Sequence, residues 1–113
     1  MSQITTHVLD VSLGKPAAAI PVILEMEMPD NEWMEISRGA TDPDGRIKHL
    51  LEPGTLSTGT YRLTFDTRVY FESRDIVGLY PVVTIAFEVR NPNEHYHIPL
   101  LLSPYGYSTY RGS

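Results

Sequence analysis

The sequence predicts an all-β protein whose short strands pack as a two-sheet sandwich. Apolar and polar side chains alternate with a period of two, which is typical of strands that bury one face. Turn signals rich in Pro, Gly, Asn and Asp separate these stretches. Seven or so strands at this spacing favour a β-sandwich. At 113 residues the chain is expected to form a single domain, 1–113, around one core.

Three stretches show the alternation clearly, and their apolar members are expected to face the core. These members are Ile20, Val22, Leu24 and Met26, then Tyr61, Leu63 and Phe65, and then Val83, Ile85, Phe87 and Val89. The turn signals are LGKPA at 13–17, MPDNE at 28–32, DPDG at 42–45, NPNE at 91–94 and SPYG at 103–106. The segment 67–78 fits neither the strand period nor the helix period, so a short helix and a loop both remain open.

Composition narrows the function classes. The net charge of −5 and the lack of a basic cluster argue against nucleic acid and anionic membranes as partners. No apolar run approaches the roughly 18 residues of a membrane span. The first residues lack the pattern of a secretion signal, so a cytoplasmic location is expected. With no cysteine, disulfides, thiolate metal sites and a cysteine nucleophile are excluded, and chemistry falls to His, Arg, Ser, Tyr and carboxylates.

The spacing of His95 and His97 places both imidazoles on one face of a strand, about 6 to 7 Å apart at the backbone. Such a pair can supply a general base near neutral pH. It can also bind a metal, particularly if His7 supplies a third ligand as in three-histidine zinc sites. Two surface histidines at a strand end are the third interpretation. The spacing alone leaves all three open.

Other polar residues are less specific. His7 shares its parity with the apolar residues at 9, 11 and 13, so the default prediction is a core histidine. Arg46 follows the DPDG turn, where a strand should begin, and its guanidinium can hold an imide or a carboxylate. Lys48 and His49 are expected to be surface residues. No nucleophile motif surrounds Ser113.

The last nineteen residues, HYHIPLLLSPYGYSTYRGS, have an interpretable order. IPLLLS is apolar enough for an inner strand, PYGY predicts a turn, and STYR can return as an edge strand. Tyrosine combines a large apolar face with a polar tip and is enriched at interfaces. The tail therefore favours burial against another subunit.

A set of motifs spans nearly the whole chain: THVLD, GKPAAAIPV, TDPDGRI, YRLTFDT leading into YF, and the nineteen-residue tail. Together they resemble the transthyretin-like family and, within it, the 5-hydroxyisourate hydrolases of urate degradation. The ending formed by Tyr110, Arg111, Gly112 and Ser113 is the most specific part. The hydrolases of the family end in this tetrapeptide, which the hormone-carrying transthyretins lack.

The resemblance implies a transthyretin-like sandwich of about eight strands with one short helix, which would be the 67–78 segment. It implies a homotetramer with sites in a central channel at the subunit interface, 5-hydroxyisourate as the substrate, and no metal or other cofactor. The implied catalytic residues are His7, Arg46, His97 and Ser113. The implied substrate-binding residues are His7, Arg46, Tyr110, Arg111 and Gly112. His95 flanks the motif and receives no catalytic role.

These residues suit the opening of a ring amide by water. His7 and His97 are expected to position and deprotonate the water, and Arg46 to hold the imide edge and stabilise the oxyanion. Ser113 is expected to orient substrate or water through its hydroxyl or a terminal carboxylate. Two alternatives remain: a transthyretin-like carrier of a small ligand without catalysis, and a zinc-dependent hydrolase using His7, His95 and His97.

Overall fold

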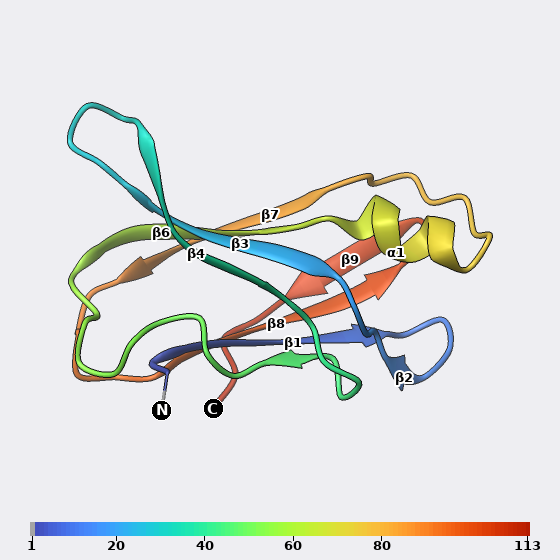
Figure 1. The fold of residues 1–113 in the computed structure, drawn as a ribbon, viewed down its shortest axis with the longest axis horizontal. Coiled ribbons are helices and arrows are strands. Elements are labelled where there is room, and N and C mark those ends of the chain that lie inside the picture. The colour runs from blue at the N-terminus through green and yellow to red at the C-terminus, as the bar shows by residue number, and fades with distance from the viewer. Residues whose placement is uncertain (1) are drawn as a thin grey trace.

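The computed structural model describes residues 2–113. Within them nine strands form two facing sheets, and one helix follows the sixth strand (Figure 1). The elements are β1 (Ile4–Asp10), β2 (Lys15–Pro16), β3 (Pro21–Glu27), β4 (Trp33–Ala40), β5 (Arg46–Ile47), β6 (Gly59–Phe65), α1 (Thr67–Ser73), β7 (Val83–Val89), β8 (Tyr96–Ser103) and β9 (Gly106–Thr109). One sheet has the order β2-β1-β8-β9, with β5 also paired to β1, and the other has the order β4-β3-β6-β7. The predicted two-sheet sandwich with one short helix is confirmed.

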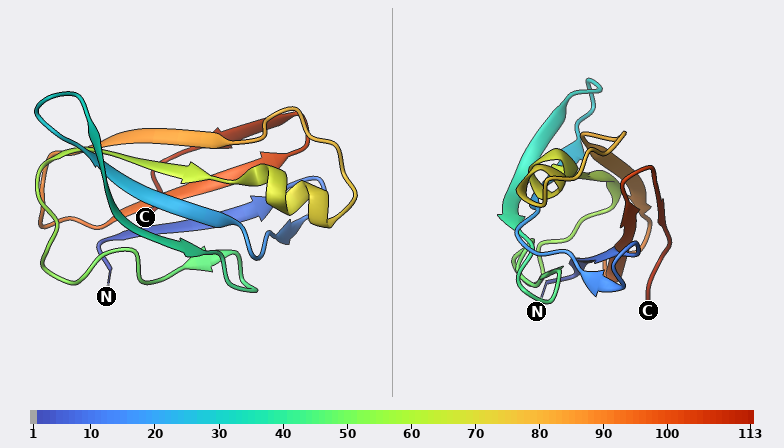
Figure 2. Two further views of the ribbon diagram at one scale, coloured as in Figure 1. Left: turned by 45° about the horizontal axis from the view of Figure 1, so that its top comes forward. Right: turned by 90° about the vertical axis from the view of Figure 1, so that its right-hand side faces the viewer.

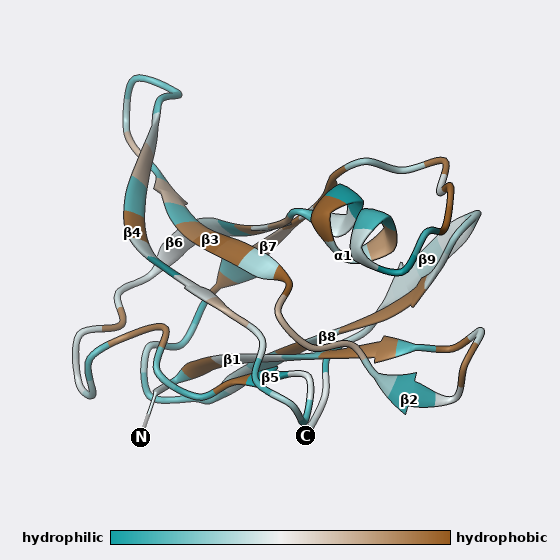
Figure 3. Ribbon diagram, turned by 45° about the vertical axis from the view of Figure 1, so that its right-hand side comes forward, coloured by the Kyte–Doolittle hydropathy of each residue, from teal (hydrophilic) through white to brown (hydrophobic). Residues whose placement is uncertain are grey.

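The core lies between the sheets and follows the predicted alternation. Among the residues expected to face it, Val22, Leu24, Leu63, Phe65 and Val83 have no exposed surface. Strand β8 is apolar along most of its length (Figure 3), because it lies between β1 and β9 in the middle of its sheet. The prediction of an inner strand at IPLLLS is therefore confirmed. A returning edge strand also follows it, but β9 covers Gly106–Thr109, so it begins within the predicted PYGY turn and ends before Tyr110 and Arg111 of the predicted STYR strand.

Strands β1 and β8 pair in parallel, from Ile4 opposite Tyr96 to Asp10 opposite Leu102. Parallel strands need a long connection, and here most of the chain lies between the two. The pairing therefore places the beginning of the chain beside its end, in the centre of one sheet.

The prediction that His7 is a core residue is wrong. In β1 the even-numbered residues face the core, and Val8 has no exposed surface, whereas His7 is half-buried on the outer face. The prediction from the odd–even alternation failed because β1 ends at Asp10. Val11 and Leu13 lie in the following turn and are 53% and 42% exposed, so they do not mark a core face.

Helix α1 lies at one end of the sandwich (Figure 2) and covers part of the segment that the sequence left open. The side chain of Asp66 caps its N-terminus by accepting a hydrogen bond from the Val69 amide. Thr67, Tyr70 and Phe71 form its buried face. The helix ends at Ser73, and a loop leads from there to β7. Nowhere in residues 2–113 does a helix have the length and apolar character needed to cross a bilayer.

A buried carboxylate joins this helix to the end of β1. The Tyr70 hydroxyl donates to Asp10 Oδ2 at 2.7 Å, and the Ser12 amide donates to Asp10 Oδ1 at 3.0 Å. Burial raises the pKa of Asp10, but the hydrogen bonds from Ser12, Tyr70 and the Leu13 backbone outweigh burial and leave the pKa lowered. Burial and the bond to Asp10 raise the pKa of Tyr70 to about 12.

Replacing Tyr70 with Phe is expected to lower the free energy of unfolding by about 1 to 3 kcal/mol at neutral pH, because the buried Asp10 carboxylate loses a donor. A carboxyl with a lowered native pKa stabilises the fold above its unfolded pKa of about 3.9. That contribution disappears as the pH falls through the native pKa, so the deficit of Tyr70→Phe should shrink in acid. Urea denaturation at matched protein concentration measures both effects. Tyr105→Phe, at a ring that is 70% exposed, is the control. A deficit that stays constant in acid would contradict this account.

Candidate active site

Two strand pairings bring the predicted polar residues together on the outer face of the five-stranded sheet. Thr5 lies opposite His97 in the β1–β8 pair, and His7 lies opposite Arg46 in the β1–β5 pair. Alternate residues of a strand share a face, so Thr5 and His7 stand on the same side of β1. The register therefore gathers residues from the beginning, the middle and the end of the chain.

Arg46 is positioned by the DPDG turn, as the sequence predicts. Asp42 Oδ1 accepts hydrogen bonds from the amides of Asp44 at 2.9 Å and Arg46 at 3.0 Å. Gly45 has a φ of +75°, in the left-handed region that favours glycine, and its carbonyl accepts a bond from the Val8 amide at 2.8 Å. The turn thus fixes β5 against β1, and the exposed Arg46 begins that strand.

The two imidazoles of the H-x-H motif lie on one face, as predicted. The ring centroids of His95 and His97 are 6.4 Å apart, with 19° between the ring planes. Tyr96 points the other way and is buried. The hydroxyl of Thr5 lies between the rings, 3.0 Å from His95 Nε2 and 2.8 Å from His97 Nδ1.

The tail closes one side of the site through Gly112. Its amide donates to the His97 carbonyl at 2.9 Å, in an isolated antiparallel bridge. A Cβ on Gly112 would overlap Cδ2 of the His97 ring and lie 3.2 Å from its Cγ. This close approach requires glycine, and it places Ser113 beside the histidines.

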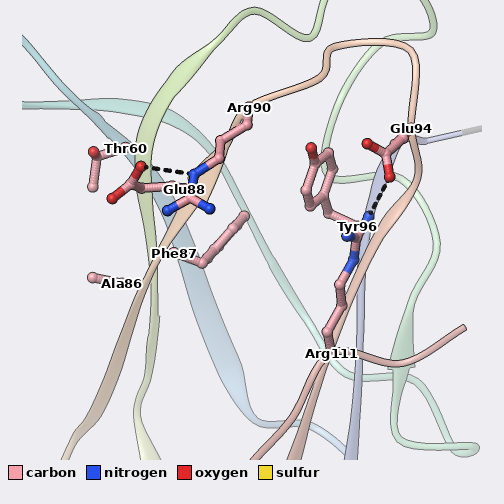
Figure 4. Close-up of a pocket in the computed structure, with 8 residues that line it drawn as sticks. All are labelled: Thr60, Ala86, Phe87, Glu88, Arg90, Glu94, Tyr96 and Arg111. Carbon is pink, nitrogen blue, oxygen red and sulfur yellow. Dashed lines mark hydrogen bonds and ion pairs between the residues drawn. The ribbon is translucent and has the colours of Figure 1, made fainter.

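The side chain of Arg111 lines a different cavity, where it lies beside Glu94 and Tyr96 (Figure 4). It contacts Glu94 Oε1 at 3.3 Å and the His95 carbonyl at 3.2 Å, both through Nη2. Its guanidinium carbon lies 4.4 Å from the centre of the Tyr96 ring. Tyr110, in contrast, is 56% exposed. Substrate binding by Tyr110 and Arg111 stays a prediction.

A cavity of about 480 Å³ opens where these groups meet. Three of the four predicted catalytic residues, Arg46, His97 and Ser113, are part of its lining. His7 lies outside the lining but adjoins it through its pairing with Arg46.

Three further lining residues were missed or undervalued in the sequence. Lys48 and His49 line the cavity, although no sequence motif distinguishes them from ordinary surface residues. Thr5 shares the parity of His7, which was the available signal, but its pairing with His97 depends on a register between strands that sequence alone does not reveal.

A second cavity of about 530 Å³ lies on the other side of the tail, beside β7 (Figure 4). Its charged side chains pair with one another, Arg90 with Glu88 at 3.4 Å and Arg111 with Glu94 at 3.3 Å. Because it lacks histidines and its charges are paired, we assign the candidate active site to the first cavity.

The electrostatics of the first cavity favour a neutral His97. Burial lowers the pKa of this imidazole below its ordinary value of 6.5, and the positive charges of Arg46, His95 and His7 lower it further. A neutral ring at physiological pH can accept a proton, as a general base must. Within residues 2–113 no three His, Asp or Glu side chains are grouped as metal ligands, so the zinc alternative gains no support from ligand geometry.

Comparison with known proteins identifies relatives of two kinds. The 5-hydroxyisourate hydrolase of Salmonella dublin is 47% identical over 110 residues, which cover 97% of this chain and 80% of that protein. The structure of Klebsiella pneumoniae 5-hydroxyisourate hydrolase superposes with a TM-score of 0.86 and 34% identity over the full length of both chains. Sea bream transthyretin in complex with thyroxine superposes with a TM-score of 0.92 and 29% identity, covering 98% of this chain and 95% of that one.

The family assignment agrees with the resemblance stated from the sequence motifs. Residues 4–112, which include every strand of both sheets, match the HIUase/Transthyretin family over nearly the whole chain. The transthyretin fold is thus confirmed together with the recognition made from the motifs. The chain belongs to the HIUase/Transthyretin family.

Proposed function

We propose that this protein hydrolyses 5-hydroxyisourate, opening a ring amide with water to give 2-oxo-4-hydroxy-4-carboxy-5-ureidoimidazoline in urate degradation. The observation that carries this function is the convergence of a base, a cation and a hydroxyl, from His97, Arg46 and Ser113, on one cavity. The hydrolase names of relatives at 47% identity support it. The fold does not separate hydrolase from carrier, because a thyroxine-bound transthyretin matches it with a TM-score of 0.92.

Each group of the cavity has a role in the reaction. His97, kept neutral by its surroundings, takes a proton from the attacking water, with His7 beside Arg46 helping to position that water. The hydroxide adds to the amide carbonyl, and the guanidinium of Arg46 stabilises the oxyanion that forms. When the C–N bond breaks, the imidazolium of His97 returns the proton to the leaving ring nitrogen. Proton and charge then balance without a metal or another cofactor.

The tail supplies orientation in this proposal. Ser113 lines the cavity and orients substrate or water. Gly112 holds the tail against His97, and Arg111 fastens it through Glu94 and the Tyr96 ring. Direct contact of Tyr110 or Arg111 with substrate belongs to the same proposal and requires the channel of an assembled protein.

The proposed assembly is a homotetramer with its sites in a central channel at the subunit interface. Within residues 2–113, strands β7 and β9 each end a sheet and leave one edge unpaired, which suits pairing with another chain. Tyr105, Tyr107 and Tyr110 are exposed near the β9 edge, a residue type that interfaces favour. A single domain over 1–113 and a cytoplasmic location complete the proposal, both from sequence.

The first experiment follows the decay of freshly generated 5-hydroxyisourate by ultraviolet absorbance, with and without chelator-treated protein. We expect the wild-type protein to accelerate the decay with chelator present, and His97→Asn to lower turnover by about 10² to 10⁴, the scale of a lost general base. No acceleration by intact protein would favour the carrier. Activity lost on chelation and restored by zinc would favour the zinc hydrolase.

The pKa of His97 provides a second test, by NMR titration of the ring. We expect a value below 6.5, and an increase in Arg46→Met, because the neighbouring positive charge that disfavours the imidazolium is gone. The acid limb of kcat/KM should lie at the same low pKa in the wild-type protein. Arg68→Met, at an exposed residue of α1, is the control and should leave the pKa unchanged. Equal pKa values in wild type and Arg46→Met would contradict the assignment.

Gly112→Ala tests the contact between tail and base. The added methyl group would displace the His97 ring or break the Gly112–His97 backbone bond, and a displacement of about 1 Å can cost 10²-fold in rate. Gly106→Ala is the matched control, because a Cβ there meets Ser103 Oγ at an ordinary 3.8 Å. We expect a large loss of kcat in the first variant and near wild-type turnover in the second. Equal activity of the two would show that the tail does not position His97.

A further inference from the structure

The Thr5 hydroxyl links the protonation states of two histidines. Its oxygen lies 3.0 Å from His95 Nε2 and 2.8 Å from His97 Nδ1. A hydroxyl carries one proton and can accept two hydrogen bonds, so it either donates in one of these bonds and accepts in the other, or accepts in both. Within residues 2–113 the two ring nitrogens are the only hydrogen-bond partners of this hydroxyl, so acceptance in both bonds would leave its own proton without an acceptor, and the first arrangement is favoured. Because each neutral imidazole carries a single N–H, the tautomers of the two rings are coupled through this oxygen.

Two proton orders satisfy this chain. In the first, His97 Nδ1–H donates to Thr5, which donates to His95 Nε2, and the Nε2 of His97 keeps a free lone pair. In the second, His95 Nε2–H donates to Thr5, which donates to His97 Nδ1, so the proton of a neutral His97 sits on Nε2. Only the first order leaves Nε2 of His97 able to accept a proton.

The surroundings hold the His97 ring in the orientation that this chain requires. Thr5 contacts the Nδ1 side, and Gly112 packs against Cδ2 on the opposite side, so the Nε2 end of the ring points away from both. Thr5 is half-buried, directly opposite His97 in the strand pairing, and its β-branched side chain has few rotamers.

The proposed base role selects between the two orders, because a ring protonated at Nδ1 has a free lone pair at Nε2 for the proton of the attacking water. Burial and nearby positive charges lower the pKa of His97 and so favour the neutral ring, in which the position of the single proton matters. At the other end of the chain, His95 is exposed, and its own backbone carbonyl is held by Arg111.

We propose that the Thr5 hydroxyl, with His95 as its acceptor, holds neutral His97 in the tautomer protonated at Nδ1 and leaves Nε2 free. This inference rests on the proposed function, in which Nε2 of His97 is then the atom that takes the proton from the attacking water and later returns it. Thr5 and His95 act through His97, so both are positioning residues. The H-x-H spacing then has a purpose, because the first histidine fixes the tautomer of the second.

The tautomers are read directly by two-bond ¹H–¹⁵N correlation spectra of the histidine rings in the ¹⁵N-labelled wild-type protein. At about pH 8, well above the ordinary pKa of an imidazole, His95 and His97 should both be protonated at Nδ1. In Thr5→Val, which keeps the shape and loses the hydroxyl, the His97 signal should shift toward the Nε2–H form, whereas Thr5→Ser should keep the wild-type pattern. A wild-type ring protonated at Nε2, or an unchanged His97 tautomer in Thr5→Val, would overturn the inference.

Kinetics supply the second readout. Thr5→Val should lower kcat by at least about 10-fold, the scale of a lost outer partner of a functional histidine, with little change in KM, because the hydroxyl is engaged by the two histidine rings. Thr5→Ser should recover most of the turnover. Thr84→Val, which removes an exposed hydroxyl from β7 in the other sheet, is the control. Hydrolysis by the wild-type protein tests the proposed function, while the tautomer spectra alone decide the role of Thr5.

Discussion

The parallel pairing of β1 with β8 is the constraint on which the rest of the structure depends. Its register sets Thr5 against His97 and at the same time buries Val8 and Leu100, which lie opposite each other and have no exposed surface. A slip of one residue would turn every side chain of β1 to the other face, with His7 in the core and Val8 in water. Burial of the apolar face of β1 therefore fixes the register that places the polar residues of its other face beside His97. The free energy of burial at the core fixes the geometry of the site.

More of the fold than of the candidate site could be predicted from the sequence. Strand alternation predicted the buried residues of β3, β6 and β7, because one buried face imposes a period of two. It failed at His7, where apolar residues of a turn imitated a strand. Arg46 and His97 were found because a turn and a motif mark them. Thr5 and His49 were missed, since their importance arises from pairing and from proximity across the fold, which leave no local pattern in the sequence.

The same sandwich serves a thyroxine-bound transthyretin and 5-hydroxyisourate hydrolases, so the backbone does not decide between carriage and catalysis. In this chain the groups proposed for catalysis lie on the outer face of one sheet and in the tail. The tail contributes through what it lacks as much as through what it adds, because the missing side chain of Gly112 lets the backbone approach the His97 ring closely. Arg111, fastened to Glu94 and Tyr96, holds that approach from the far side. In the proposed hydrolase this contact orients the base, a role that a carrier without catalysis does not need.

Arg46 connects the two halves of the proposed chemistry. Its positive charge lowers the pKa of His97 and so keeps the base deprotonated before the reaction begins. When negative charge develops on the substrate oxygen beside the guanidinium, part of that positive field is neutralised, and protonation of His97 becomes easier. The base therefore strengthens as the oxyanion forms, and the proton and the charge move in step. In the proposed mechanism, the guanidinium of Arg46, held at the start of β5 by the Asp42 turn, stabilises the oxyanion and adjusts the pKa of the base at the same time.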